Sequence, residues 1–152
     1  MTITTDRLTI RAATDDEMRA LIDAQTDEDM RAAYGEMLAG CLKAPTQREW
    51  FAAWFIETTV GERIGELCFK GIADDGAVEI GYGLHHEHWG KGYATEAVRA
   101  LCDWAAKQPG VTRIEAETDA DNLASQRVLE KSGFLPTGET GEEGPRYIRR
   151  IG

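Results

Sequence analysis

Two glycines that flank a lysine, Gly90-Lys91-Gly92, stand between an apolar run at residues 78–84 and a segment of helical periodicity at residues 94–106. Because glycine carries no Cβ, the backbone N–H groups of such a loop can turn toward one point. The unpaired N–H groups of the first helical turn, and the positive end of the helix dipole, point to the same place. The segment therefore predicts a binding site for a phosphate or pyrophosphate group.

One acidic residue of the apolar run is a candidate for proton transfer. In a strand at residues 78–84, successive side chains point to opposite faces. One face would carry the apolar residues Val78, Ile80, Tyr82 and Leu84. The other would carry Glu79, Gly81 and Gly83. The two glycines leave an open surface on which a ligand could approach the carboxylate. We therefore predict that Glu79 is a general base, with a plain solvent-facing glutamate as the alternative.

Length and composition indicate one globular domain, residues 1–152. The chain has 152 residues, of which 42% are hydrophobic and 29% charged, enough for an apolar core. No run approaches the ~18 apolar residues of a membrane span, and the N-terminus lacks the regions of a signal peptide. The cysteines Cys41, Cys68 and Cys102 are far apart and have apolar neighbours, which favours reduced, packed thiols. We expect a cytoplasmic protein without a membrane partner.

The charge balance restricts the class of partner. The formal net charge is −10, from 27 Asp and Glu residues against 17 Lys and Arg residues. A nucleic-acid partner would require a basic face, so none is expected. The acidity favours cationic partners such as amines, although an acidic surface also serves solubility.

The chain contains segments with strand, turn and helix patterns in a regular order. Strands are expected at residues 7–11, 64–69, 78–84 and 113–118, with hairpin turns at 60–63 and 74–76. Helices are expected after a cap at Thr14 and at residues 27–42, 94–106 and 122–131, where Gly133 ends the last one. A further helical piece is expected from Gln47 toward Phe55, and two short strands close the chain.

The order of these elements predicts the fold class. Strands 78–84 and 113–118 flank the helix at 94–106, and such a crossover requires a parallel pair. The hairpins imply antiparallel neighbours. We therefore expect an α+β (mixed α/β) fold with a mixed, mostly antiparallel central sheet flanked by helices.

Three motifs carry a family resemblance, in the same order along the chain. They are Glu79-Ile80-Gly81-Tyr82, Trp89-Gly90-Lys91-Gly92-Tyr93-Ala94-Thr95-Glu96-Ala97 and Asn122-Leu123-Ala124-Ser125-Gln126-Arg127-Val128-Leu129-Glu130-Lys131-Ser132-Gly133-Phe134. Together they resemble the GNAT superfamily of acetyl-CoA-dependent N-acetyltransferases. The closest resemblance is to the Rim-type branch, which acetylates ribosomal-protein N-termini, and residues 5–11 resemble the first strand of that branch. One departure is Glu87, where the superfamily pattern has Gln or Arg.

The resemblance implies a co-substrate and a set of binding residues. The co-substrate is acetyl-CoA, with its thioester in a gap where strands 78–84 and 113–118 splay apart. A backbone N–H near residues 82–84 would meet the thioester carbonyl oxygen. The implied binding residues are Tyr82, Leu84, Trp89, Gly90, Lys91, Gly92, Tyr93, Ala94, Thr95, Asn122 and Ser125.

The resemblance also implies catalytic roles. An acid at the position of Glu79 serves as base in several GNAT enzymes, and a serine at the position of Ser125 lies near the thioester sulfur, where it could donate a hydrogen bond to the leaving thiolate. Many relatives use a tyrosine in that neighbourhood, and we expect none here. Asn122 would contact the CoA arm, or act only as a helix N-cap. Arg127 and Lys131 could touch CoA phosphates, but a solvated basic pair is the preferred interpretation.

Other interpretations are weighed against these. A dinucleotide-binding oxidoreductase would require a third glycine where Thr95 stands. A catalytically silent acyl-CoA-binding or interaction module on the same fold stays open. The histidines at positions 85, 86 and 88 are interpreted as a solvated turn, so no metal is expected.

The acceptor side is less determined by the sequence. Trp50 and Trp54 could form an aromatic wall, although core packing is preferred. The acceptor is expected to be a primary amine, either a protein N-terminus or a small molecule, attacked directly in a ternary complex. A homodimer is compatible with the sequence.

Overall fold

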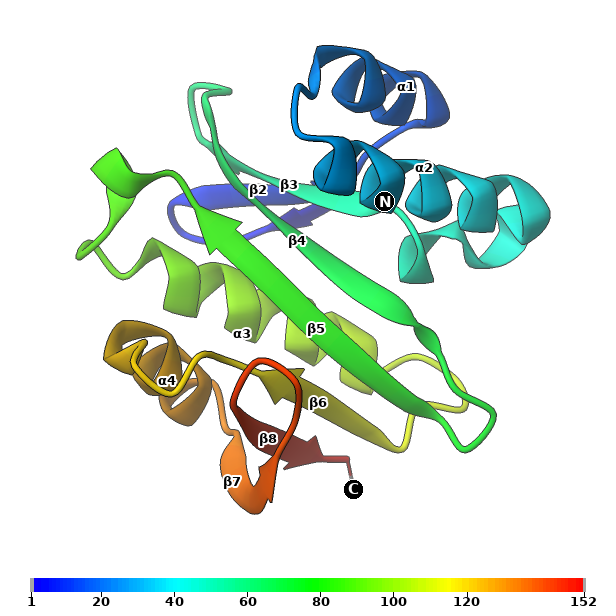
Figure 1. Cartoon of the computed structure of the whole chain (residues 1–152). Coiled ribbons are helices and arrows are strands. Elements are labelled where there is room, and N and C mark those ends of the chain that lie inside the picture. The colour runs from blue at the N-terminus through cyan, green and yellow to red at the C-terminus, as the bar shows by residue number, and fades with distance from the viewer. Residues whose placement is uncertain (1, 152) are drawn as a thin grey trace.

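A single eight-stranded sheet organises the computed structural model, which describes residues 2–151. Its strand order is β1-β2-β3-β4-β5-β6-β8-β7, and β5 and β6 form its one parallel pair (Figure 1). This confirms the α+β fold and the mixed, mostly antiparallel sheet. The strands are β1 (Thr2–Thr4), β2 (Leu8–Ala12), β3 (Ala53–Thr58), β4 (Arg63–Ile72), β5 (Ala77–Leu84), β6 (Arg113–Glu117), β7 (Leu135–Thr140) and β8 (Pro145–Arg150).

Helices pack on both faces of this sheet. The α-helices are α1 (Asp15–Ala24), α2 (Glu28–Lys43), α3 (Tyr93–Ala106) and α4 (Leu123–Lys131), with short 3₁₀ turns η1 (Pro45–Trp50) and η2 (His86–His88). The buried stripe of α3 joins the larger core, with α4 beside it, whereas α1 and α2 form a second core on the opposite face (Figure 1). No helix in residues 2–151 is long and apolar enough to cross a membrane.

The helix ends follow the local signals in the sequence. Thr14 and Glu17 form a capping box at α1, and Asp27 accepts hydrogen bonds from the first turn of α2. Gly133 lies just beyond α4 and has a left-handed φ of 92°. A residue with a Cβ would be strained in this conformation. These boundaries confirm the helices predicted from the sequence to within two residues.

The expected helical piece from Gln47 toward Phe55 is wrong beyond Trp50. A short 3₁₀ turn ends there, and the chain then enters β3, in the middle of the sheet. Trp54 and Ile56 join the larger core while Ala53 and Phe55 join the other. Because β3 is buried on both faces, its sequence lacks the polar alternation that marks a strand.

Aromatic residues fill the centre of the larger core. Trp50 and Trp54 each lie 5.1 Å from Trp104 between ring centroids, and Trp50 meets Phe69 edge-on at 4.9 Å. Trp54 is fully buried and Trp50 nearly so. The two tryptophans therefore pack the core, as preferred from the sequence, and do not line a wall.

The parallel pair opens into a gap. β5 and β6 pair only where residues 77–79 lie beside residues 113–115. Beyond this point β5 continues along β4 to Leu84, while β6 continues along β8. The gap therefore lies beside the C-terminal half of β5, in front of the first turn of α3.

Candidate active site

The loop between η2 and α3 has the backbone that the sequence predicts. Gly90 and Gly92 have φ values of 76° and 80°, and Gly92 is the N-cap of α3. Among the backbone hydrogen bonds of residues 2–151, none is donated by the N–H groups of residues 90–92. The first helical N–H groups that follow have no acceptor within the helix either. A row of unpaired donors thus lines one end of the gap.

Arg7, just before β2, contacts this loop. Its Nη1 donates to the carbonyl oxygen of Lys91 at 2.9 Å, and its Nε pairs with Glu96 Oε1 at 2.7 Å. Its guanidinium carbon lies 4.5 Å from the centroid of the Tyr93 ring. Burial would raise the pKa of Glu96, but hydrogen bonds from Thr5 and Arg7 outweigh it and the pKa is lowered. The sequence contains no local signal for this contact.

A groove of about 670 Å³ begins at the loop and runs between α3 and α4 to the end of β5. It carries no carboxylate within the described residues, although the chain is strongly acidic. Arg127 and Lys131 bring two positive charges to it, so the groove suits an anionic ligand. The residues that line it are Tyr82, Gly83, Leu84, His88, Trp89, Gly90, Gly92, Tyr93, Ala94, Thr95, Asn122, Leu123, Ala124, Ser125, Arg127, Val128 and Lys131.

Every predicted binding residue except Lys91 lies in this lining. The carbonyl of Lys91 faces Arg7 instead. Trp89 is 61% exposed, and its Nε1 donates to the carbonyl oxygen of Leu84 at 2.8 Å. Asn122 Oδ1 accepts from the N–H of Ser125 at 3.0 Å, so Asn122 caps α4 and also borders the groove.

A tyrosine lies beside Ser125, which corrects the expectation that none would. Tyr82 Oη is 2.6 Å from Ser125 Oγ, and it also donates to the Ser125 carbonyl at 3.1 Å. Burial raises the pKa of Tyr82, so the phenol keeps its proton at neutral pH. The sequence places Tyr82 on the apolar face of β5, but only the packing of α4 on that face makes the contact.

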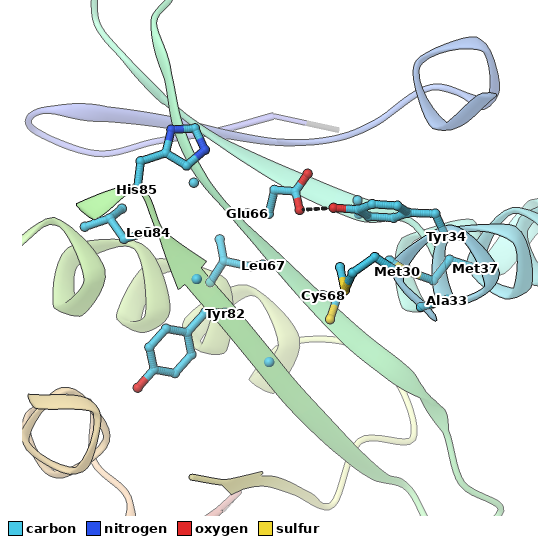
Figure 2. Close-up of a pocket in the computed structure, with 14 residues that line it drawn as sticks. Met30, Ala33, Tyr34, Met37, Glu66, Leu67, Cys68, Tyr82, Leu84 and His85 are labelled. Carbon is cyan, nitrogen blue, oxygen red and sulfur yellow. Dashed lines mark hydrogen bonds between the residues drawn. The ribbon is translucent and has the colours of Figure 1, made fainter. Parts of the chain in front are cut away.

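A second cavity, of about 580 Å³, opens on the other face of β5 (Figure 2). It is lined by α2, β3, β4 and β5, and it contains Gly81 and Gly83, as expected for the side-chain-poor face of that strand. Tyr82, Gly83 and Leu84 border both cavities. Tyr34 of α2 donates to Glu66 Oε2 of β4 at 2.7 Å, a bond that Figure 2 draws between the two side chains. Sequence reasoning did not single out either residue.

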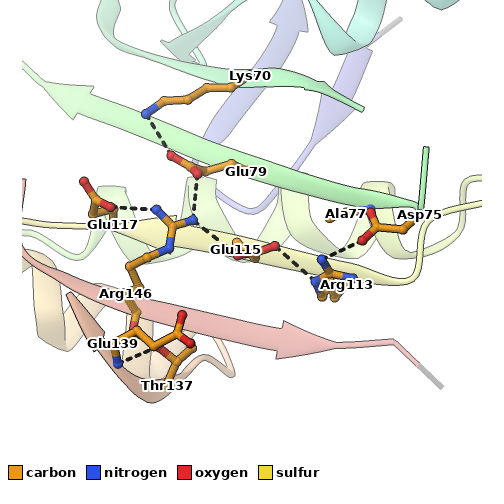
Figure 3. A network of polar contacts seen from close by, with 10 residues as sticks. All are labelled: Lys70, Asp75, Ala77, Glu79, Arg113, Glu115, Glu117, Thr137, Glu139 and Arg146. Atoms are coloured by element: carbon orange, nitrogen blue, oxygen red, sulfur yellow. Dashed lines mark hydrogen bonds and ion pairs between the residues drawn. The ribbon is translucent and has the colours of Figure 1, made fainter. Parts of the chain in front are cut away.

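Glu79 lies on the predicted face of β5 but outside the lining of both cavities. Figure 3 shows it between Lys70 and Arg146, each 2.8 Å from one of its oxygens. Burial would raise the pKa of Glu79, but these two hydrogen-bonded cations outweigh it and the pKa is lowered. A carboxylate held in this way is a weak proton acceptor, so the base role of Glu79 stays a prediction without geometric support.

The histidines beside the loop make contacts of their own. His88 Nε2 lies 3.0 Å from Glu62 Oε1, and the His86 ring lies 4.6 Å from the Trp89 ring. Within residues 2–151 no group of three or more His, Cys, Asp or Glu side chains is arranged to hold a metal ion.

Comparison with known proteins agrees with this architecture. Residues 7–135 match the family model described as the acetyltransferase (GNAT) domain. The uncharacterized N-acetyltransferase YoaA of Bacillus subtilis is 32% identical over 146 residues, covering 88% of this chain and 82% of that protein. A second relative from the same organism, YjdG, is 38% identical over 94 residues, which span 60% of this chain but only 56% of the relative.

Solved structures share the fold at lower identity. The ribosomal L7/L12 α-N-protein acetyltransferase RimL, in complex with coenzyme A, superposes with a TM-score of 0.76 at 22% identity, covering 99% of this chain and 98% of the other. A chimera built on the spermidine N-acetyltransferase SpeG of Vibrio cholerae gives a TM-score of 0.72 at 19% identity, covering 94% and 95%.

Proposed function

We propose a reaction for this chain, which belongs to the GNAT family of acetyltransferases. It transfers the acetyl group of acetyl-CoA to a primary amine. The observation that carries the proposal is the pair of cavities that meet along β5, one of them free of carboxylates and ending at unpaired N–H groups. The groove suits a large anion, and the second cavity opens on the same strand from the opposite face of the sheet.

The co-substrate is bound by the groove between α3 and α4. The N–H groups at residues 90–95 receive the pyrophosphate, and Arg127 and Lys131 add positive charge. Glycine at 90 and 92 permits this backbone, and Arg7 keeps the loop in place. The acetyl end then reaches the gap beside residues 82–84.

The transfer is direct, without a covalent enzyme intermediate. The neutral amine attacks the thioester carbon, a C–N bond forms, the C–S bond breaks, and the amine gives one proton to solvent. Negative charge that develops on the carbonyl oxygen is met by a backbone N–H of β5 near residues 82–84. The departing thiolate takes a hydrogen bond or a proton from Ser125, whose hydroxyl is paired with Tyr82 and regains from solvent any proton that it gives.

The names of two structural neighbours support a primary amine as the acceptor. One structural neighbour is named as an α-N-acetyltransferase of a ribosomal protein and another as a spermidine N-acetyltransferase chimera. Both acceptors are primary amines. A catalytically silent acyl-CoA-binding module remains the competing proposal, and turnover separates the two.

The test combines binding with turnover. Acetyl-CoA and NAD are titrated at equal concentrations while the melting temperature is followed; a ligand at ~100 times its Kd stabilises by about 2.7 kcal/mol, worth several degrees here. We expect a shift with acetyl-CoA alone, followed by acetylated product from an amine panel, detected by mass spectrometry. Absence of any shift overturns the proposal, and a shift without product from any amine supports the silent module.

A further inference from the structure

One carboxylate of the second cavity has a neutral hydrogen-bond partner. Glu66 lies in β4 and lines the cavity, and its partner in the structure is the neutral phenol of Tyr34, whose oxygen is 2.7 Å from Glu66 Oε2. Within residues 2–151 no ion pair includes Glu66. Its other oxygen is therefore available to a cationic ligand (Figure 2).

The neighbouring sheet residues differ from Glu66 in this respect. Glu57 pairs with Arg11, and Glu79 with Lys70 and Arg146. A carboxylate outside any ion pair, in a partly enclosed cavity, attracts a positive charge more strongly than one in open water, because the local dielectric is lower.

Strand register places Glu66 beside the reacting region. Its Cα pairs with that of Gly83, and Gly83 borders both cavities. Because Gly83 has no side chain, β5 does not cover the carboxylate from that side. The close approach of the two strands requires glycine at position 65, where a Cβ would clash with the Gly83 carbonyl oxygen.

The wall opposite Glu66 is apolar. Helix α2 contributes Met30, Ala33 and Met37, and Figure 2 shows these residues on the side from which Tyr34 also projects. Methionine side chains adapt to apolar groups of varied shape. The described lining contains no second carboxylate.

We propose that Glu66 binds the ammonium group of the acceptor, which gives its proton to solvent before the neutral amine attacks, and that the α2 wall binds an apolar group next to it. The acceptor is then a monoamine with an apolar substituent, and not a polyamine. This inference rests on the proposed acetyltransferase function. A polyamine would place its further ammonium groups against Met30, Ala33 and Met37 without a counter-charge, at a desolvation cost.

Two kinds of acceptor fit this description: a free amine with an apolar substituent, and a peptide whose first residue is apolar. The experiment measures steady-state kinetics of the full chain at saturating acetyl-CoA with phenethylamine, a Leu-initiated peptide amide and spermidine, with product detected by mass spectrometry. We expect the first or second to exceed spermidine in kcat/KM. If only the peptide is acetylated, the acceptor is a polypeptide N-terminus; if phenethylamine is acetylated equally well, it is a small amine.

Substitutions test the residues. Glu66→Gln should raise the acceptor KM about 10- to 100-fold, the effect of losing a hydrogen bond to a charged group, and leave the Kd for acetyl-CoA unchanged. Glu36→Gln removes the same charge from the exposed side of α2, outside the cavity, and should leave KM unchanged. Ala33→Glu adds a second carboxylate to the wall and should lower the KM for spermidine.

The outcomes separate this inference from the proposed function. A wild-type KM for Glu66→Gln, or spermidine as the best acceptor, overturns the inference while the acetyltransferase stands. Absence of product with every amine overturns both.

Discussion

The phenolic oxygen of Tyr82, on β5, lies 2.6 Å from the hydroxyl oxygen of Ser125, in the first turn of α4. This contact bridges the gap between the strand that borders both cavities and the helix that borders the groove. When two hydroxyl groups are hydrogen-bonded, one donates to the other, and the second O–H is oriented and free to donate to a ligand. The leaving thiolate of the proposed reaction would meet this pair.

Removal of either hydroxyl group should therefore slow the chemical step. We expect Tyr82→Phe and Ser125→Ala each to lower kcat by about 10²-fold or more, the usual contribution of a positioned acid. The Kd for acetyl-CoA, measured by calorimetry, should change little. An unchanged kcat in both variants would remove the pair from the mechanism, whereas a loss confined to Kd would make it a binding element.

The loop offers a test of co-substrate binding. Gly92→Glu places a negative charge and a strained left-handed residue at the start of α3, so acetyl-CoA should no longer shift the melting temperature. Gly110→Glu is the matched control, because Gly110 has φ of 83°, open space around it and a place beyond the opposite, C-terminal end of α3. Equal acetyl-CoA affinity of the two variants would contradict the assignment of the loop.

Arg7 should support the loop from outside the groove. Arg7→Ala removes its bonds to the Lys91 carbonyl and to Glu96. We expect the Kd for acetyl-CoA to rise roughly tenfold, equivalent to about 1.4 kcal/mol. Arg19→Ala breaks an exposed ion pair on α1 and should have no such effect. An unaltered Kd for Arg7→Ala would mean that the loop keeps its shape unaided.

Glu79→Gln tests the predicted base. If Glu79 accepts the proton, turnover should fall most at neutral pH and recover at high pH, where the amine is already neutral. The ion pairs with Lys70 and Arg146 predict in addition a lower melting temperature. A pH–rate profile displaced by the same factor at every pH would leave Glu79 with its structural role alone.

Glu17 gives a stability prediction with a defined pH range. Hydrogen bonds from Arg11, at 2.7 and 2.8 Å, lower the pKa of Glu17 to about 2 from 4.5. Because the folded pKa lies below the unfolded one, the stabilisation is present above pH 4.5 and is lost as the pH falls toward 2. Glu17→Gln should therefore melt at a lower temperature than wild type at pH 7, and the difference should shrink below pH 4. A difference as large at pH 2.5 as at pH 7 would refute this.

Much of the site could be predicted from the sequence because its signals are local. The left-handed glycines at 90 and 92, the helical period after them and the alternation along β5 each depend on residues close in the chain. These local patterns predicted the anion-binding loop, the face of Glu79 and the parallel pair. The family resemblance rests on the same segments.

The tertiary structure decided the contacts between distant segments. Arg7 and Glu96 are 89 residues apart, Tyr82 and Ser125 are 43 apart, and Tyr34 and Glu66 are 32 apart. Each contact depends on strand register and helix packing, and a shift of one residue would turn the side chain to the other face. The sequence by itself therefore determined the fold class and the backbone of the glycine loop, whereas packing decided which hydroxyl pair and which carboxylate face the two cavities.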